Sequence, residues 1–525
     1  MPQLMHRIVP TVKGITLAFV LEKAPSRRKA LGSFYTPEHV AETLVNWVVR
    51  SPNDRLLDPS CGDGRFLASH RNVVGVDLDP AAIATVAKEL PHARVYAADF
   101  FDWAMHTRDR FECVVGNPPF IRYQRFSGDV RRSALEVCDR VGVKFSSLTS
   151  SWAPFVVAAA SLLKPGGRLA FVVPAEIGHA PYAKPVLRYL LSRFHQVSVI
   201  AVREKVFPDL SEDVWFLYAD GFGGESDRIT FSQWDEFPRK AARPNKGLHV
   251  SRHEWEKWGE RLRSFLISPD VRDAYREISE RSDSVRLGEI ARVGIGYVSG
   301  ANDLFHLRPS EARQLGIPNE FLRPTVRRAG FLRRGTITPA IVEGWLQRDE
   351  PVLLLHLPQK GRLPDCVMKY LDTASAQQAR LGYKCRNRNP WYTVPDVTVP
   401  DAFLAYMSGL GPRLVLNNAS CACTNSIHAI HLTNGLSSSE LRKRWTHPFV
   451  ELSCEIEGHP LGGGMLKLEP REAARIVLPS TVAKVSQELQ AAISKGVTTL
   501  RRWRHYVCER PSAPILTRRV SWRGC

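Results

Sequence analysis

Length, composition and charge narrow the classes of protein to which this sequence can belong. A chain of 525 residues is too long for one ordinary hydrophobic core, so roughly two or three domains are expected. Its hydrophobic content of 44% and charged content of 24% are typical of a globular protein and exclude a disordered chain. The formal net charge of +19 favours a polyanionic partner, above all nucleic acid. A basic enzyme without such a partner stays an alternative.

Cysteine spacing and apolar segments bear on the compartment. None of the 10 cysteines forms a C-x-x-C pair, and the close pair Cys421 and Cys423, near His428, has no second ligand cluster. A zinc site needs about four ligands, so we expect reduced thiols and no metal. No apolar run reaches the ~20 residues that span a bilayer, and no cleavage site follows the apolar N-terminal stretch. These features predict a cytoplasmic protein without a membrane partner.

From about residue 31, helical and strand patterns alternate along the chain. The stretch SFYTPEHVAETLVNWVV predicts a helix with Thr36 as N-cap and Pro37 at the first helical position. Four short apolar runs follow, and each ends in acidic, Gly or Pro residues: RLLDPSCGDGRFL, NVVGVDLDP, ARVYAADFF and FECVVGNPPF. An Ala-rich helical stretch separates the second run from the third. Strands separated by helices indicate a doubly wound, parallel α/β sheet.

Three more strands, RLAFVVPAE, QVSVIAV and DVWFLYAD, bring the predicted sheet to seven strands. After about Gly221 this rhythm ends, and short β-rich pieces later alternate with Pro, Gly and Asn turns. The expected organisation is an N-terminal extension (1–30), an α/β catalytic domain (31–225), a largely helical connection (226–283) and a mixed α+β domain (284–525).

The loop DPSCGDGRFL predicts a ligand site at the end of the first strand. Gly62 and Gly64 allow the backbone to approach a ligand, although the loop is neither a Walker loop nor the full dinucleotide fingerprint. Asp77 and Asp99 end the second and third strands, so with Asp58 they should meet at the carboxyl edge of the sheet. Taken alone, each is explained more simply as a turn-forming or helix-capping residue, and it is their occurrence on three consecutive strands that indicates a site. An acidic pocket favours S-adenosylmethionine, which is cationic and lacks phosphate, over NADP or ATP.

The ordered motifs FYTPEHVAETLV, LLDPSCGDGRFL, GVDLDP, ADFF and GNPPF resemble those of the gamma-group N6-adenine DNA methyltransferases of restriction–modification systems, over roughly residues 31 to 220. The resemblance implies a class I, Rossmann-like methyltransferase fold with S-adenosylmethionine as cofactor. It also implies that Thr36 and Asp58 belong to the methionine site, that Asp77 binds the ribose and that Asp99 binds the adenine. The expected cofactor residues are Thr36, Asp58, Ser60, Cys61, Gly62, Asp77, Leu78, Asp99 and Phe100.

The stretch GNPPF places chemistry at the end of the fourth strand. Two prolines stop the sheet ladder and hold Asn117 on a rigid turn. The Asn117 side-chain oxygen and the Pro118 carbonyl can accept hydrogen bonds from the two N–H groups of an exocyclic amine. Phe120 offers a face on which the base can stack. The predicted catalytic residues are Asn117, Pro118, Pro119 and Phe120. Such contacts require a flipped base. A capped turn is the structural alternative.

Two further sets of residues are candidates for DNA contact. The segment REKVFPDLSEDVWFLYAD resembles the family segment that supplies a second wall for the extruded base, with Phe207 as the aromatic residue; a core Phe is the alternative. In the C-terminal half, ARVGIGYVSGANDLF, RLVLNNASCACTNSIHAIHL and LGGGMLKLEP resemble target-recognition regions. The stretch YKCRNRNPWY combines cations with aromatic rings, which suits phosphates or guanine edges: Lys384, Arg386, Arg388, Trp391 and Tyr392. A solvated loop beside a partly buried Trp is the alternative.

Together these features predict a site-specific DNA methyltransferase, adenine-specific, that flips its target adenine in double-stranded DNA and protects that DNA from a restriction enzyme. We expect a monomer, and a separately encoded restriction endonuclease, because only about thirty residues precede the sheet. Two alternatives stay open. One is methylation of another planar nitrogen, in a protein glutamine or an RNA guanine; the other is a catalytically inert DNA-specificity protein.

Overall fold

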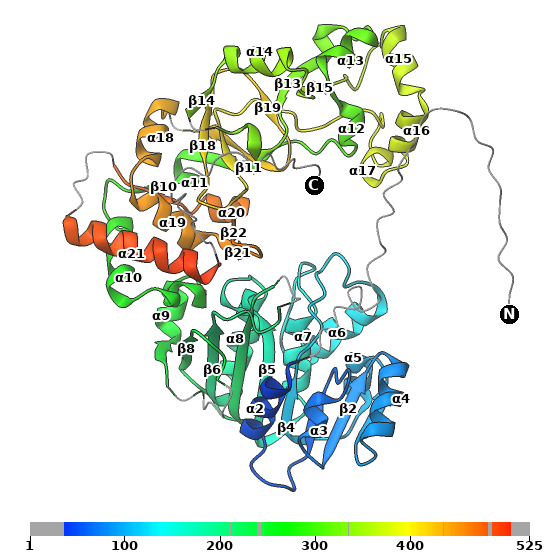
Figure 1. The fold of residues 1–525 in the computed structure, drawn as a ribbon, viewed down its shortest axis with the longest axis vertical. Helices are drawn as coiled ribbons and strands as arrows, with labels where there is room; N and C mark the ends of the chain where they lie inside the picture. The colour runs from blue at the N-terminus through cyan, green and yellow to red at the C-terminus, as the bar shows by residue number, and fades with distance from the viewer. Residues whose placement is uncertain are drawn as a thin grey trace, which may run out of the picture. The chain divides into compact units, whose positions relative to one another are not determined.

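The computed structural model describes the chain in seven stretches: 36–208, 212–238, 244, 246–333, 335–433, 435–480 and 486–505 (Figure 1). The predicted N-terminal extension, 1–30, lies outside them. The chain forms two compact units, residues 1–164 and 165–525. This boundary lies inside the predicted catalytic domain, at the start of its fifth strand.

The first unit contains four parallel strands in the order β3-β2-β1-β4. Leu57 of β1 lies opposite Val74 of β2 on one side and Val114 of β4 on the other. A helix follows each of β1, β2, β3 and β4, as the alternating sequence patterns predict. The elements are α2 (Glu38–Val48), β1 (Leu56–Asp58), α3 (Arg65–Ala68), β2 (Val73–Asp77), α4 (Pro80–Glu89), β3 (Arg94–Ala97), α5 (Phe100–His106), β4 (Phe111–Gly116), α6 (Gly128–Arg140) and α7 (Trp152–Ala160). The loops after the four strands therefore share one edge of the sheet.

The first helix begins one residue later than its sequence predicts. Pro37, not Thr36, is the N-cap of α2, and its carbonyl accepts bonds from the backbone N–H groups of Val40 and Ala41 at 3.0 and 3.1 Å. Thr36 is buried, and its hydroxyl accepts a bond from the side chain of Asn117. The predicted capping role is wrong because this hydroxyl faces a residue 81 positions away in the sequence.

The second unit begins with strands in the order β5-β7-β6-β8-β9: β5 (Leu163–Pro174), β6 (Phe194–Val202), β7 (Val214–Phe222), β8 (Arg228–Trp234) and β9 (Leu248–Ser251). Helices η1 (Ala175–Gly178) and α8 (Ala183–Leu191) lie between β5 and β6. β7 runs antiparallel to both of its neighbours, whereas β6 and β8 are parallel. The described residues between β6 and β7, 203–208 and 212–213, contain no helix, and a connection without a crossover favours an antiparallel strand.

The segment 226–283 is only partly the helical connection expected from its sequence. It begins with β8 and β9, two strands beyond the seven predicted, and continues with α9 (Arg252–Lys257), η2 (Leu262–Leu266) and α10 (Pro269–Ser279). In β8 the buried Ile229 and Phe231 alternate with more exposed residues, the pattern of a strand with one covered face.

The remainder of the second unit is mixed α+β, as predicted. Its strands form sheets in the orders β11-β20-β16-β18-β14, β12-β15-β13-β19, β17-β22-β21 and β10-β23. The strands are β10 (Val285–Arg286), β11 (Ala291–Ile295), β12 (His306–Leu307), β13 (Leu322–Val326), β14 (Gly335–Ile337), β15 (Leu353–Leu355), β16 (Ala402–Ala405), β17 (Met407–Ser408), β18 (Leu414–Asn417), β19 (Ala422–Cys423), β20 (Ile427–Leu432), β21 (His459–Leu461), β22 (Met465–Lys467) and β23 (Val477–Leu478). The helices are α11 (Leu287–Ile290), α12 (Asn302–Phe305), α13 (Pro309–Gln314), η3 (Asn319–Phe321), η4 (Ala329–Phe331), α14 (Pro339–Gln347), α15 (Asp365–Leu371), α16 (Ala374–Arg380), α17 (Tyr383–Arg386), α18 (Ser438–Trp445), α19 (Phe449–Glu457), α20 (Pro470–Ala473) and α21 (Gln487–Trp503).

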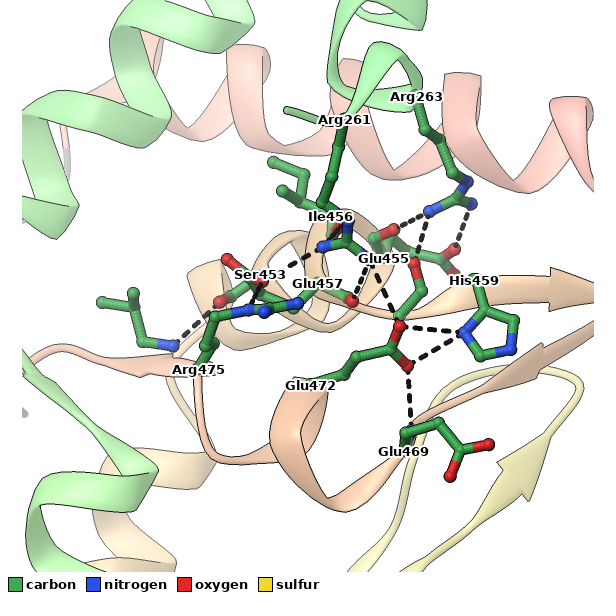
Figure 2. Close-up of polar contacts among 12 residues, drawn as sticks. Arg261, Arg263, Ser453, Glu455, Ile456, Glu457, His459, Glu469, Glu472 and Arg475 are labelled. Carbon is green, nitrogen blue, oxygen red and sulfur yellow. Dashed lines mark hydrogen bonds and ion pairs between the residues drawn. The ribbon is translucent and has the colours of Figure 1, made fainter. Parts of the chain in front are cut away.

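Two buried arginines support the C-terminal end of α19 (Figure 2). Arg261 donates to the carbonyls of Ile456 and Glu457 at 3.2 and 2.7 Å, and Arg263 donates to the carbonyls of Glu455 and Gly458. These carbonyls have no partner within the helix, so the guanidinium groups satisfy them and offset the negative end of the helix dipole. The contacts fix α19 to the segment around η2.

The cysteine pair noted in the sequence is part of a core. Cys421 and Cys423 are buried, and burial raises the pKa of each thiol to about 12. Nε2 of His428 lies 2.8 Å from the carbonyl of Leu468. Among the described residues, no group of three or more His, Cys, Asp and Glu side chains could hold a metal. None of the described helices has the length and apolar character of a membrane span.

Candidate active site

A cavity of about 470 Å³ lies at the carboxyl edge of the strands of the first unit. The loops that follow β1, β2, β3 and β4 all contribute to it. Ten of the residues singled out from the sequence line it: Thr36, Ser60, Cys61, Gly62, Asp77, Leu78, Asp99, Phe100, Asn117 and Pro119. The parallel strands thus bring together residues that span more than 80 positions of the chain.

Asp58 lies beneath the cavity lining and is fully buried. Its Oδ1 accepts a bond of 3.0 Å from the backbone N–H of Ser60, while its Oδ2 has no hydrogen-bond partner among the described residues. Burial, reinforced by the nearby carboxylate of Asp77, raises the pKa of Asp58 well above its ordinary value. A buried carboxylate oxygen without a partner is costly, so this position suits a cationic ligand.

Asp77 joins the loops that follow β1 and β2. Its Oδ2 accepts a bond from the N–H of Gly62 and its Oδ1 one from the N–H of Asp79, both at 2.9 Å. Gly62 has φ of +50°, a left-handed conformation that favours glycine and turns its N–H toward the carboxylate. The next residue, Leu78, is 58% exposed and lines the cavity. A carboxylate beside an exposed apolar side chain suits a ribose and its attached base.

Asp99 is both a helix cap and a cavity residue. Its Oδ1 accepts bonds from the N–H groups of Phe101 and Asp102 at 2.9 and 3.0 Å, which makes it the N-cap of α5. Burial raises its pKa above the ordinary value. Phe100 stacks on Phe155 with ring centroids 5.3 Å apart, and Phe101 meets the same ring edge-on at 4.6 Å. Asp99 therefore lies next to a cluster of packed aromatic rings.

The Asn-Pro-Pro-Phe turn is attached to its surroundings at both ends. Nδ2 of Asn117 donates to the hydroxyl of Thr36 at 3.2 Å, and the hydroxyl of Ser60 donates to the Asn117 carbonyl at 3.4 Å. Ser151, just before α7, donates its hydroxyl to the carbonyl of Pro119 and accepts a bond of 2.9 Å from the N–H of Ile121. The backbone N–H of Ser151 also donates to the Ile121 carbonyl at 3.0 Å. These bonds orient the Asn117 amide at the cavity.

Sequence reasoning did not find the part of the cavity that comes from α6 and α7. Ser151, Phe126 and Phe155 line it. Phe126 precedes α6, Ser151 precedes α7 and Phe155 lies within α7, and no local signal in the sequence distinguishes them. Two predicted catalytic residues, Pro118 and Phe120, do not belong to the lining: Pro118 is buried and Phe120 half-buried.

The predicted DNA-contacting residues divide into two kinds. Arg388 donates to the carbonyls of Ser299 and Val298, both at 2.6 Å. Trp391 and Tyr392 are half-buried and pack against a hydrophobic core of the second unit. These three positions have the structural role that the alternative interpretation expects, whereas Lys384 and Arg386 are exposed.

Phe207, predicted to face the target base, lies in the second unit after β6 and is 6% exposed. This burial is what a core position would give. Its contact with a base stays a prediction.

Comparison with known proteins identifies three matching family models. Residues 18–90 match N-6 DNA Methylase, residues 80–207 match Eco57I restriction-modification methylase, and residues 257–507 match Type II methyltransferase M.Eco57I, C-terminal domain. Together they cover both units of the chain.

Individual relatives agree with these models. The chain is 23% identical to Type II methyltransferase M.XamI of Xanthomonas campestris pv. amaranthicola, over 86% of each chain. It is 19% identical to Type II methyltransferase M.AccI of Acinetobacter calcoaceticus, over 85% of this chain and 84% of the relative. A solved structure of the type IIG restriction endonuclease BpuSI aligns with 91% of this chain and 66% of its own, at 14% identity and a TM-score of 0.42.

The resemblance predicted from the motifs is confirmed at the level of N6-adenine-type DNA methyltransferases of restriction–modification systems. The matches do not single out the gamma group. They imply S-adenosylmethionine as the cofactor, and the acidic cavity with the unpartnered Oδ2 of Asp58 fits a ligand that carries an ammonium and a sulfonium.

Proposed function

We propose that this chain is a site-specific DNA methyltransferase that flips an adenine out of duplex DNA and methylates its N6 amine. The observation that carries the proposal is the Asn117 amide, oriented by Thr36 at the edge of an acidic cavity. An adenine N6 amine is a poor nucleophile because its lone pair is delocalised into the ring. Acceptors placed on its two N–H groups localise that lone pair and direct it toward the methyl carbon.

Asn117 can act as an acceptor because its amide has a defined orientation. Nδ2 donates to Thr36, and in the proposed reaction Oδ1 accepts a hydrogen bond from an N–H of the amine. The Pro118 carbonyl receives the second N–H, and neither oxygen places a positive charge near the sulfonium. The hydrogen bonds of the Ser151 hydroxyl to Pro119 and Ile121 hold the backbone of the turn while the base enters. Phe120 supplies the stacking face for that base.

The acidic residues bind the cofactor, which supplies an electrophilic methyl group. Oδ2 of Asp58 attracts the ammonium of the methionine moiety, and Asp77 accepts bonds from the ribose hydroxyls while keeping its bonds to Gly62 and Asp79. Asp99 uses Oδ1 for the helix cap, so Oδ2 is the oxygen that meets the adenine amine. Leu78 and Phe100 cover the faces of that ring.

The biological role follows from the relatives and the charge. The named relatives are Type II methyltransferases, which supports modification of DNA at a specific sequence, and a net charge of +19 suits a polyanionic duplex. We infer that the chain acts as a cytoplasmic monomer on double-stranded DNA and that a separately encoded restriction endonuclease recognises the same site.

The test is transfer of a labelled methyl group from S-adenosylmethionine to unmodified genomic DNA, followed by sequencing of the methylated bases. We expect N6-methyladenine in one sequence context. Asn117→Ala should lower transfer at least about 100-fold while cofactor affinity changes little, and the exposed Asn53→Ala serves as the matched control. No transfer to any unmodified DNA refutes the proposal. Label in RNA or in a protein glutamine instead of DNA means that the substrate is wrong.

A further inference from the structure

The helical segment between β15 and β16 presents an unusual apolar surface. Its helices α15, α16 and α17 lie together at one end of the second unit (Figure 1). Leu381, which follows α16, and Tyr383, the first residue of α17, are 66% and 68% exposed, the highest values among the large hydrophobic residues that the structure describes. Exposed apolar side chains mark a contact with another molecule when they form part of a contiguous surface.

The surroundings of these two side chains are strongly basic. Residues 360–388 contain seven Lys or Arg against two Asp. Arg380, Lys384 and Arg386 are all exposed. The Arg386 guanidinium carbon lies 5.5 Å and the Lys384 ammonium 5.9 Å from the centre of the Tyr383 ring. The exposed Tyr383 ring therefore has a cationic rim formed by Lys384 and Arg386, which matches a polyanion rather than a second copy of this basic chain.

The segment is held rigidly from below. Cys385, which lies between the two rim cations Lys384 and Arg386, has no exposed surface and belongs to a hydrophobic core. Arg388 fixes the end of the segment through its two bonds to Val298 and Ser299. A Cβ at Gly300 would lie 2.8 Å from the Cβ of Lys384, so the backbones approach closely there. Leu381 and Tyr383 are thus presented on a fixed support.

We propose that Leu381 and Tyr383 form an apolar wedge that contacts the bases or sugars of duplex DNA in a groove, while Arg380, Lys384 and Arg386 contact the flanking phosphates. Apolar side chains inserted next to cation–phosphate contacts are a common way for proteins to grip a deformed duplex. The inference rests on the proposed function, because that function makes DNA the substrate. The proposed DNA contact does not involve Arg388, Trp391 and Tyr392, which have a structural role.

The test compares two double variants of the full chain on a fluorescent 30-base-pair duplex of mixed sequence, with the dissociation constant measured over a series of salt concentrations. Leu381→Ser with Tyr383→Ser should weaken binding about tenfold at every salt concentration, because it removes a contact that does not depend on ions. Lys384→Gln with Arg386→Gln should instead reduce the salt slope by about 1.8. Ile341→Ser, at a 40% exposed position of α14, is the control and should change neither quantity.

Thermal unfolding of each variant shows whether the fold is kept, and none of these exposed residues should change the midpoint. Unaltered binding by the Leu381 and Tyr383 variant overturns the wedge. A change in its sedimentation instead of its DNA affinity identifies another copy of the chain as the partner and overturns it as well. Methyl transfer to unmodified genomic DNA separates the two proposals. A wild-type chain that binds DNA through the wedge but transfers no methyl group to genomic DNA contradicts only the proposed function.

Discussion

Replacing Thr36 with Val tests whether this residue acts through Asn117. Valine has nearly the shape of threonine but lacks the hydroxyl that accepts the 3.2 Å bond from Nδ2 of Asn117. Thr36 is 4% exposed, so water replaces that bond poorly. One such hydrogen bond contributes about 1 kcal/mol, and without it the amide can turn its NH2 end toward the substrate. We expect methyl transfer to slow by about five- to tenfold, since 1.4 kcal/mol corresponds to a factor of ten.

The assay is single-turnover methyl transfer with saturating cofactor, together with an equilibrium measurement of cofactor binding. Thr36→Val should lower the transfer rate while the cofactor dissociation constant changes less than about twofold. Thr36→Ser keeps the hydroxyl and should restore most of the rate. The backbone carbonyl of residue 36 accepts a hydrogen bond from Arg65 at 2.9 Å and is present in every variant, so this bond does not contribute to the difference.

The opposite pattern refutes this reasoning. If Thr36→Val weakens cofactor binding and leaves the transfer rate of the saturated enzyme unchanged, Thr36 contacts the cofactor directly, as the family resemblance alone implies. Equal rates for the Val and Ser variants would also contradict an effect through the hydroxyl.

Three further predictions concern the turn, the acidic pocket and the buried arginines. Ser151→Ala removes the two hydrogen bonds of the hydroxyl, to the Pro119 carbonyl and from the Ile121 N–H, so the transfer rate should fall about tenfold with unchanged cofactor affinity; an unchanged rate would mean that the turn keeps its conformation without these bonds. Because burial raises the pKa of Asp58, the folded state binds its proton more tightly than the unfolded state, and stability should decline as pH rises from the ordinary value through the raised one. Asp58→Asn should remove that decline in pH-dependent thermal unfolding and weaken cofactor binding. Arg263→Met, which leaves buried carbonyls without donors, should lower the unfolding free energy by about 3 kcal/mol in urea titrations, against less than about 0.5 kcal/mol for Arg276→Met, whose side chain is 37% exposed.

The sequence alone determined the sheet of the first unit and most of one side of its cavity. Strands β1 to β4 appear as short apolar runs, and the acidic or Gly-rich residues that end them are local features of the chain. Because all four strands are parallel, residues that end them must meet at one edge. Asp77, Asp99 and Asn117 could therefore be assigned to one site from the sequence, without knowledge of any contact.

Only the tertiary structure decided what each of these residues touches. Thr36 appears in the sequence as a helix cap, yet its hydroxyl bonds to Asn117, 81 positions away. Phe155 reaches the cavity from helix α7, and Ser151 from the position just before it, and this segment carries no distinguishing motif. Arg261 and Arg263 donate to the carbonyls at the C-terminal end of α19, almost 200 residues further along the chain. Such contacts depend on where distant side chains come to lie in the packed chain, and no local pattern records that position.

The same distinction explains the basic stretch of the second unit. Its composition predicted contact with nucleic acid, but composition does not separate a cation that bonds to backbone carbonyls, such as Arg388, from one that faces solvent, such as Arg386. Exposure is a property of the fold, because it depends on which side of a short helix meets the core. The sequence determined that cations and aromatic residues are concentrated in this stretch. Packing decided that the side chains of Leu381 and Tyr383 are exposed to solvent.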